Sequence, residues 1–473
     1  MDPDRLKICQ DSQMAFINTA TNSDFRGGPV DVWPRGSIEP DRPFLCHEYL
    51  NLCVKLDSRM EGDFTGAWMP PTTRAERAAW LGKFGLDHAW GDRLQDAQHR
   101  QQAYWQKRGV ESARADPHCD GFCFWTIVDV VVKQFDAYTS QGFLDPFWRP
   151  KRGGWTPEEF AKFNSPTCVL ADFLPDRSVF VTGERFRCDF LLSHYGERPL
   201  ERATLRWKLS VGERVLSSGD VPAGDQPLGP ARKVGSVEIV VPEVENPVKA
   251  TFAVETGDAA NAWDVWLFPR RERRRISGVA ASKSLLPDLG RLYDGIVPAD
   301  KADGCRVAIL TPDDPLKSAL LEKGVHVVTL GPVGRSQPRK VSAWTMGEEV
   351  DQKIVDKFDC GNDDYSLGWW FMGRQVGVAM RESPLLGRLP HDGTLSPLFF
   401  RIIGGGRQLP VPDVTKDDLV MVGEGGETCS TYVSSRTCGA GRLTEVNGLD
   451  LLSGYPEGTC ILDGLIDATE MKR

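Results

Sequence analysis

The stretch Pro43-Phe44-Leu45-Cys46-His47-Glu48-Tyr49 combines a short apolar run with a carboxylate near its end. Short apolar runs without helical spacing are typical of buried strands, and similar runs occur at 14–18 and 121–129. The run at 121–129 is almost continuously apolar and rich in residues that favour strands. Because such strands suit a parallel sheet covered on both faces, the sequence predicts that residues 43–49 lie within an α/β domain.

A helical region separates the run at 43–49 from the run at 121–129. It begins at Thr72-Thr73-Arg74-Ala75-Glu76, where a capping threonine precedes an acidic first turn, and we expect helix again over 78–81 and 92–107. The alternation of strand, helix and strand is the rhythm of a (β/α) barrel. We therefore assign residues 1–150 to one α/β domain.

Residues 151–275 have a different pattern. Thr156-Pro157-Glu158-Glu159-Phe160 has a capping threonine and a proline at the first helical position, which predicts a short helix. Beyond this helix, strands are expected at 178–181, 186–192, 204–209, 235–241, 249–254 and 263–269. Short strands at this spacing indicate an immunoglobulin-like β-sandwich. The basic run 270–275 that follows indicates a solvated linker.

Residues 300–473 return to an α/β pattern. Strands and helices are expected at 306–310, 314–323, 326–330, 441–446 and 459–468. This order predicts a small doubly wound domain, flavodoxin-like or amidotransferase-like. The glycine-rich loops 404–406 and 423–426 lack the spacing of phosphate-binding loops, and no cysteine lies in a nucleophile elbow, so neither phosphate binding nor amidotransferase chemistry is expected.

Composition narrows the classes of function. The chain has 473 residues and a formal net charge of −9, so neither nucleic acid nor an anionic membrane is the expected partner. No apolar run is long enough to span a bilayer, and the charged segment 1–5 does not look like a secretory signal. The 12 cysteines include no CxxC pair, which favours reduced thiols in a cytoplasmic protein without a zinc site. We expect no cofactor.

Five segments are informative in combination. In order along the chain they are Asp2-Pro3-Asp4-Arg5, the strand 43–49, Phe64-Thr65-Gly66-Ala67-Trp68-Met69-Pro70, the strand 121–129, and the passage 153–167. Together they resemble glycoside hydrolase family 2, in its beta-galactosidase-like branch. The first resembles the segment before the sixth barrel strand, and the two strands resemble the seventh and eighth.

This resemblance implies that residues 1–150 hold the last strands of a (β/α)8 TIM barrel. It also implies a retaining glycosidase that acts on β-galactosides or related β-linked sugars, with Glu48 at the nucleophile position. Two departures matter. Leu50 follows Tyr49 where family members often have glycine, and the fourth-strand Asn-Glu pair that supplies the acid/base has no counterpart. We therefore expect a fragment, a split-gene subunit or a remodelled relative.

Retaining hydrolysis requires two carboxyl groups about 5–5.5 Å apart, one of which attacks the anomeric carbon. Glu48 fits this role because catalytic side chains stand at the carboxyl ends of barrel strands. The alternative for Glu48 is a strand-ending glutamate that pairs locally. His47 alternates to the other side of the strand, so a structural hydrogen bond is the alternative to its binding substrate.

Four further residues are candidates for contact with the sugar. Asp129 ends the predicted strand 121–129 and is a candidate for the second carboxylate, and its alternative is a strand-end aspartate that binds backbone N–H groups of the next loop. Asp24 follows the sixth strand, and its alternative is the cap of a turn. Trp125 would stack on the sugar, and core packing is its alternative. Tyr49 would donate its hydroxyl to Glu48 and keep the carboxylate ionised, and packing is again the alternative.

The missing strands leave a second function open. Three strands cannot close an eight-stranded barrel, and open strand edges normally require a partner. We therefore expect, besides a carbohydrate substrate, either a homo-oligomer or a partner chain that completes the barrel. The alternatives to an enzyme are a non-catalytic carbohydrate-binding or accessory subunit and a truncated product without function.

Overall fold

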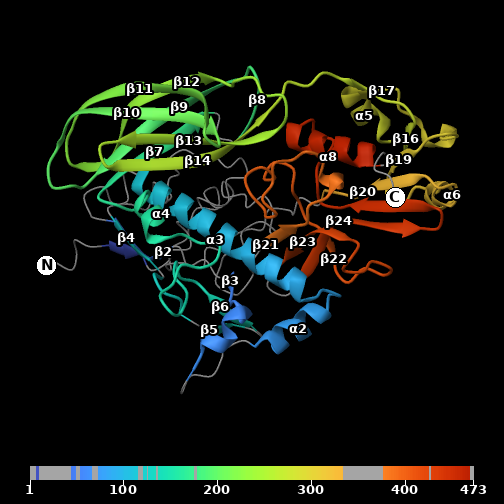
Figure 1. Cartoon of the computed structure of the whole chain (residues 1–473), viewed down its shortest axis with the longest axis horizontal. Coiled ribbons are helices and arrows are strands. Elements are labelled where there is room, and N and C mark those ends of the chain that lie inside the picture. Colours follow the sequence, from blue (N-terminus) through green and yellow to red (C-terminus); the bar gives the residue numbers. More distant parts are fainter. Residues whose placement is uncertain are drawn as a thin grey trace.

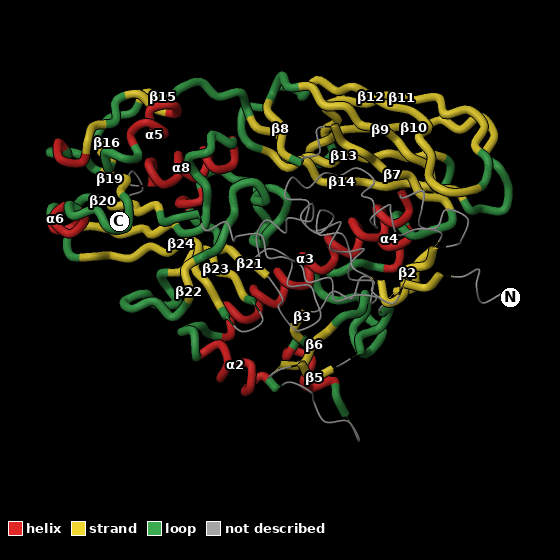
Figure 2. Tube along the Cα trace, turned by 180° about the vertical axis from the view of Figure 1, so that it is seen from behind, coloured by secondary structure: helices red, strands yellow, loops and turns green. Residues whose placement is uncertain are grey.

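The computed structural model describes residues 7–9, 44–49, 54–65, 73–115, 121–124, 126–130, 132–134, 137–174, 178–333, 377–425 and 428–468. Figure 1 shows a β-sandwich along the top left and a large sheet with its helices on the right. One long helix, α3 (His88–Ala115), runs diagonally below both, and Figure 2 shows the same arrangement from behind. The helix contacts strands of the sandwich, of the large sheet and of the N-terminal part.

A parallel sheet forms the N-terminal part. Its three described strands lie in the order β1 (Lys7–Cys9), β2 (Phe44–Tyr49) and β4 (Gly121–Phe124). The strand predicted at 43–49 is therefore observed as β2, in the centre of this sheet. The strand predicted at 14–18 lies outside the described residues. Within the described ranges the sheet does not close, and the partial TIM barrel stays a prediction.

The strand predicted over 121–129 was too long. β4 ends at Phe124, and residues 126–130 instead run beside the later segment 142–145, where Val128 forms a parallel bridge with Leu144. Ile127 and Val130 are exposed there, so the apolar run continues past the sheet onto the surface. A separate antiparallel sheet has the order β3 (Val54–Lys55), β6 (Ala137–Ser140) and β5 (Val132–Gln134).

Two helices occupy the region predicted to be helical. α2 (Arg74–Gly82) begins with a capping box in which Thr73 and Glu76 satisfy each other's backbone N–H groups. α3 extends the predicted helix 92–107 at both ends and has 28 residues. The 3-10 helix η2 (Ser58–Asp63) precedes them. Leu81 of α2 and Leu94 of α3 pack with residues of the large sheet, so local helix signals place these two elements against the C-terminal part.

The β-sandwich consists of two antiparallel sheets preceded by the short helix α4 (Pro157–Ala161). One sheet has the order β11 (Arg214–Gln226), β10 (Leu200–Val211), β13 (Val248–Thr256), β14 (Ala259–Phe268) and β8 (Val179–Val181), the last pairing in parallel. The other has the order β12 (Gly229–Val240), β9 (Arg185–His194) and β7 (Thr167–Leu174).

The core of the sandwich confirms that two sheets face each other. Phe190 of β9 stacks on Phe252 of β13 with ring centroids 6.2 Å apart, and Trp207 of β10 stacks on the same ring at 5.9 Å. The six strands predicted between 178 and 269 all exist, while β7 and β11 were missed. β11 alternates mostly between exposed and half-buried residues, so its sequence carries little apolar signal. The name immunoglobulin-like stays a prediction.

The C-terminal part is built on a nine-stranded mixed sheet. Its parallel strands have the order β18 (Val297–Pro298), β16 (Val279–Ala281), β19 (Val307–Leu310), β20 (His326–Leu330) and β25 (Gly441–Val446). The chain places β18 on one side of β16 and then β19 on the other, as in doubly wound sheets. β16 and β18 were not predicted. Three further strands that were not predicted continue the sheet in antiparallel pairing: β24 (Cys429–Cys438), β23 (Leu419–Glu424) and β21 (Gly377–Met380).

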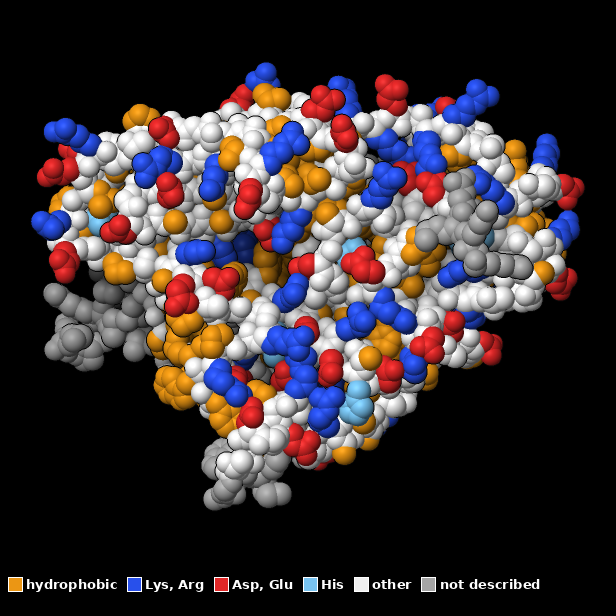
Figure 3. Space-filling view, viewed as in Figure 1, with side chains coloured by type: hydrophobic (Ala, Val, Ile, Leu, Met, Phe, Trp, Pro, Cys, Tyr) orange, Lys and Arg blue, Asp and Glu red, His pale blue; other side chains and the backbone are white. Residues whose placement is uncertain are grey.

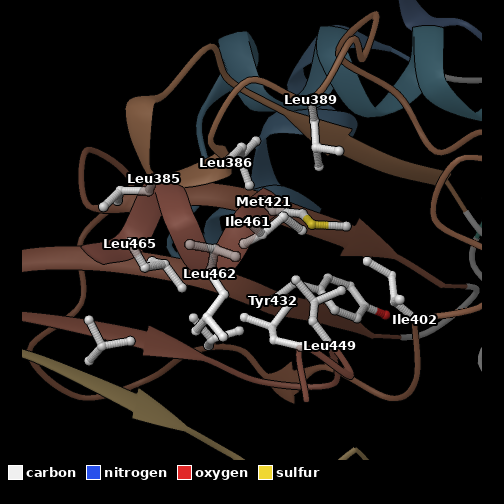
Figure 4. Packing of buried hydrophobic residues seen from close by; sticks show 14 of the residues in the cluster. Leu385, Leu386, Leu389, Ile402, Met421, Tyr432, Leu449, Ile461, Leu462 and Leu465 are labelled. Carbon is white, nitrogen blue, oxygen red and sulfur yellow. The ribbon is translucent and has the colours of Figure 1, made fainter. Parts of the chain in front are cut away.

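Short elements complete this part. They are β15 (Arg274–Arg275), α5 (Leu286–Leu292), β17 (Tyr293–Asp294), η3 (Ala299–Lys301), α6 (Lys317–Glu322), η4 (Pro384–Leu386), β22 (Arg407–Gln408) and α8 (Pro456–Asp467). Figure 4 shows Ile461 and Leu465 of α8 among the side chains of η4 and of the sheet. α6 and α8 fall close to the helices predicted at 314–323 and 459–468.

The basic run 270–275 is more than a solvated linker. Arg274 pairs with Asp467 of α8 at 2.7 Å and with Asp463 at 3.1 Å, and Arg271 also pairs with Asp463. These acidic partners lie far along the chain, so the basic run alone gave no sign of them. Among the described residues, no helix is both long and apolar enough to cross a membrane.

Candidate functional site

The carboxyl ends of β2 and β4 form one edge of the parallel sheet, here called the β2–β4 edge. Glu48 is the fifth of the six residues of β2, and Tyr49, the last, pairs with Phe124 at the end of β4. Strands that run in parallel end at the same edge, and the pairing of Cys46 with Phe122 and of Tyr49 with Phe124 places His47 and Glu48 beside the end of β4. The predicted residues Asp24 and Trp125 lie outside the described residues.

Asp129 follows β4 but makes its contacts inside the neighbouring loop. Its carboxylate accepts hydrogen bonds from Ser140 Oγ and from the Gly142 backbone N–H, both at 2.6 Å. The Nζ of Lys151 pairs with it at 2.8 Å, and both side chains are almost fully buried. A Cβ at Gly142 would lie 2.5 Å from the Asp129 nitrogen, so only glycine fits. These contacts favour the structural alternative for Asp129 over contact with a sugar.

A row of aromatic rings supports the β2–β4 edge. Phe124 packs on Phe143 at 4.9 Å between ring centroids, Phe143 on Phe160 at 4.7 Å, and Phe160 on Phe163 at 5.2 Å. Edge-to-face pairs of this kind are each worth about 0.5–1.5 kcal/mol beyond their buried area. The row therefore fixes the loop 142–155 and α4 firmly against the end of β4.

A second group of interacting polar side chains lies in the interior of the protein, and the sequence did not predict it. The Glu424 carboxylate, at the end of β23, is 0% exposed. Its Oε1 accepts a hydrogen bond from Lys55 Nζ at 2.7 Å and is also contacted by Arg77 Nη1. Its Oε2 accepts from Arg77 Nη2 at 2.6 Å and from Gln98 Nε2 at 2.9 Å. Lys55 Nζ also lies 3.1 Å from the centroid of the Trp80 ring. We call these five residues the Glu424 cluster.

Burial and charge act in opposite directions on the Glu424 cluster. Burial tends to raise the pKa of Glu424, but Arg77 and Lys55 outweigh it and hold this pKa at about 2. Burial lowers the pKa of Lys55 to about 8, although Glu424 opposes the shift. The carboxylate is ionised, fully paired and out of contact with water, so it is suited to joining α2, β3 and β23 and unsuited to proton transfer with a substrate.

His99 of α3 is buried and held as the neutral imidazole. Burial and the nearby Lys151 charge lower its pKa to about 4. Its Nδ1 lies 3.0 Å from the Arg152 carbonyl oxygen, which can only accept, so Nδ1 carries the proton. Its Nε2 then accepts from Gln95 Nε2 at 3.0 Å, and Gln95 also donates to the Lys55 carbonyl. Both ring nitrogens are thus satisfied in the neutral form, which links α3 to the loop 142–155.

The sequence held only a faint signal for the Glu424 cluster. Glu424 stands between glycines in 423–426, a segment that resembles a loop, and its partners lie more than 300 residues earlier. In the described ranges, no set of three His, Cys, Asp or Glu side chains is arranged to hold a metal ion.

Comparison with known proteins gives short matches. A family model described as "Domain of unknown function (DUF8488)" matches residues 184–269, which cover most of the sandwich. No curated protein matches.

Three solved structures are each similar to part of this chain. Alkylpurine DNA glycosylase AlkC from Pseudomonas fluorescens, bound to DNA with an abasic site analog, is 11% identical with a TM-score of 0.18, over 22% of this chain and 31% of its own. The sporulation control protein Spo0M from Bacillus subtilis is 10% identical with a TM-score of 0.18, over 23% and 51%. The CARDB domain of a Pyrococcus furiosus protein, in complex with di-metal ions, is 7% identical with a TM-score of 0.17, over 22% and 92%. At these TM-scores the matches carry no argument about function.

Proposed function

We propose that this chain carries the nucleophile of a retaining β-glycosidase that acts on β-galactosides or related β-linked sugars. One observation carries the proposal: Glu48 stands at the carboxyl end of the central strand of a parallel sheet. Barrel enzymes place their catalytic side chains at such ends. In the same sheet β2 and β4, which correspond to the predicted seventh and eighth strands, pair in parallel.

The reaction would proceed by double displacement. The Glu48 carboxylate attacks the anomeric carbon, the bond to the leaving oxygen breaks, and that oxygen takes a proton from a second carboxylic acid. Water then attacks the glycosyl–Glu48 ester and gives its proton to the same second group, which releases the sugar and restores both carboxyls. The second carboxyl group is unassigned in this chain, and its source is part of what must be found.

Replacement of Glu48 by glutamine tests the nucleophile. The amide cannot attack the anomeric carbon, so we expect kcat for 4-nitrophenyl β-galactoside to fall by about three orders of magnitude or more. The matched control is Glu197→Gln, which changes an exposed glutamate in the sandwich and should leave turnover unchanged. Turnover by Glu48→Gln equal to that of the wild type would remove Glu48 from the mechanism.

A smaller replacement provides a product-based test. Glu48→Gly leaves room for an added azide ion, which would attack the anomeric carbon of the activated aryl glycoside from the side that Glu48 occupied. The product would be the α-glycosyl azide, identified by NMR, because a single displacement inverts the anomeric configuration. If azide restores turnover of the aryl glycoside without forming the α-glycosyl azide, the result would argue against a nucleophile at position 48.

A non-catalytic carbohydrate-binding or accessory subunit is the second candidate. It is favoured by the described parallel sheet, which has three strands and does not close. A homo-oligomer or a partner chain would then complete the barrel. Calorimetric binding of a β-galactoside without any hydrolysis would support this candidate over the enzyme.

A cytoplasmic location belongs to the same proposal. Seven cysteines of the described residues are free thiols, among them the buried Cys168, Cys188 and Cys429. Free thiols are usual where glutathione and thioredoxin keep cysteines reduced. Localisation of a tagged full chain by fractionation tests this.

A further inference from the structure

The loop beside the β2–β4 edge contains a tight hairpin with a tryptophan at its tip. The Trp148 N–H donates to the Asp145 carbonyl at 3.0 Å, and the Asp145 N–H donates to the Arg149 carbonyl at 2.8 Å. Leu144 and Pro150 form an antiparallel bridge just outside these bonds. The connection is thus a three-residue loop, 146–148, built on a turn with proline at its second position.

One buried carboxylate holds this hairpin from within. Asp145 Oδ1 accepts from the Phe147 N–H at 2.8 Å and from the Arg149 N–H at 2.9 Å. Its Oδ2 accepts from Arg149 Nε at 2.7 Å, and Arg149 also pairs with Asp63 at 2.8 Å. Phe147 packs on Phe64 at 4.9 Å between ring centroids. The tip is therefore rigid, because three side chains anchor it at its base.

Trp148 is an unusual residue for this position. Its φ is +64°, the left-handed conformation that the third residue of such loops requires and that glycine normally supplies. Its side chain is 71% exposed, so the indole ring contributes little to stability through burial. A strained backbone and a solvent-facing indole on a rigid base are better explained by binding than by packing.

The position of Trp148 relates it to the proposed catalytic edge. The hairpin follows segment 142–145, which hydrogen-bonds to residues 126–129 directly after β4. Ile127 and Val130 in that segment are 42% and 39% exposed. In Figure 3, hydrophobic side chains gather at the lower left, where Figure 1 draws the loops next to β2 and β4. An exposed apolar area therefore lies beside the strand ends that carry Glu48.

We propose that the Trp148 indole is a stacking platform for the pyranose ring of a β-galactoside or a related β-linked sugar. The choice of ligand rests on the proposed glycosidase function. The flat apolar face of the indole suits the C–H face of a pyranose, and a rigid ring loses little entropy on binding. Arg149 and Asp63 beside it are half exposed and offer a donor and an acceptor for sugar hydroxyls.

A protein partner fits the same area less well. Stable protein interfaces bury about 800 Å² on each partner. Here the large exposed apolar side chains of the described residues near the hairpin are Ile127, Val130 and Trp148. This small area with one flat ring matches one or two sugar units.

Binding without hydrolysis tests the platform independently of catalysis. Isopropyl 1-thio-β-D-galactopyranoside and its β-D-glucopyranoside counterpart resist hydrolysis and would be titrated calorimetrically into the full chain. Trp148→Ala should weaken the binding of the preferred thioglycoside about tenfold, and Trp148→Phe should retain most of it. The matched control is Tyr195→Ala, which removes an aromatic ring that is 56% exposed on the sandwich. Circular dichroism would show that each variant is folded.

The outcomes separate the platform from the reaction. Loss of binding in Trp148→Ala alone supports the platform, even if Glu48→Gln hydrolyses aryl galactosides as well as the wild type and the catalytic proposal fails. Equal affinity of Trp148→Ala and wild type would overturn the platform, and so would the absence of binding of both thioglycosides to the wild type. A loss of affinity in Tyr195→Ala as large as that in Trp148→Ala would overturn it too.

Discussion

At Trp148 the turn demands a backbone conformation that disfavours any side chain. A residue with a Cβ at φ near +64° is less stable than in ordinary conformations by about 1–2 kcal/mol. The sequence 148–155 predicts a loop, but nothing in it shows that Trp148 adopts a positive φ. The positive φ of Trp148 accompanies the hydrogen bonds that Asp145 Oδ1 accepts from the N–H groups of Phe147 and Arg149, one on each side of Trp148.

The strain at Trp148 can be measured by comparing two truncations. Trp148→Gly should be more stable than Trp148→Ala by about 0.5–1 kcal/mol, because relief of the strained φ exceeds the extra chain entropy of an unfolded glycine. Urea unfolding of both variants gives the difference. The same pair at Tyr195, whose φ is ordinary, should rank in the opposite order. An alanine variant at position 148 as stable as the glycine variant would show that the left-handed conformation is absent.

Among the elements, helices were predicted best where their signals are local. The capping boxes of Thr73 with Glu76 and of Thr156 with Glu159 were readable because each pair is three residues apart. α3 was predicted only over 92–107. The buried glutamines and His99 lie inside this range, whereas the missed ends, 88–91 and 108–115, bury the apolar Trp90, Val110 and Ala113. The groups that bond to these glutamines and to His99 are the Lys55 and Arg152 carbonyls and the Glu424 carboxylate, from β3, the loop 142–155 and β23, so the burial of this face could not be read from the helix alone.

Buried neutral His99 makes the stability of the fold depend on pH. Its folded pKa of about 4 lies below the ordinary value of 6.5, so on acidification the unfolded chain binds a proton first. Stability is therefore complete above pH 6.5 and falls between pH 6.5 and 4, by about 2 kcal/mol at pH 4.5. His326, whose pKa burial also lowers to about 4, adds a loss of the same sign.

Thermal unfolding at a series of pH values measures this dependence. His99→Gln should flatten the fall in Tm between pH 6.5 and 4.5 without abolishing it, since His326 remains. His88→Gln, which changes an exposed residue at the start of α3, is the control and should leave the slope unchanged. A slope in His99→Gln as steep as in the wild type would mean that His99 titrates normally.

Over the whole molecule, some strands with an apolar sequence were predicted and others were not. β2, β9, β10 and the parallel strands β19 and β20 appear where expected. β21 and β23 were missed although both are mostly apolar and every residue of both is buried, and β24, which also has exposed and half-buried positions, was missed as well. These three strands lie between β25 and α3, which contacts β21 and β23. For the site, the strand and its carboxylate were predicted from the sequence, whereas the pairing of β2 with β1 and β4 required the structure.

We expect the Glu424 cluster to contribute strongly to the stability of the contacts among α2, β3 and β23. Glu424→Gln would leave Lys55 and Arg77 buried without a carboxylate, which we expect to cost about 3–5 kcal/mol in free energy of unfolding. Glu238→Gln, which removes an exposed pair with Arg185, should cost less than about 1 kcal/mol. Chemical denaturation measures both, and hydrogen exchange should locate the loosening in α2 and β23.

The same cluster gives a second, more acidic transition. The pKa of Glu424 is about 2 against an ordinary 4.5, so its contribution is complete above pH 4.5 and is lost as pH falls to 2. This window lies mostly below that of His99, so the two contributions can be separated. Equal losses in Glu424→Gln and Glu238→Gln would contradict the assigned role of the cluster.

The separation of Lys55 and Glu424 along the chain, 369 residues, also bears on synthesis by the ribosome. α2 and α3 emerge long before the strand that covers them, and for most of translation their inner face meets water. Glutamines, a histidine and an arginine on that face remain well hydrated in the meantime, whereas a face of leucines would invite aggregation of the nascent chain. The buried glutamines and His99 of α3 thus suit a helix that must wait for its partner.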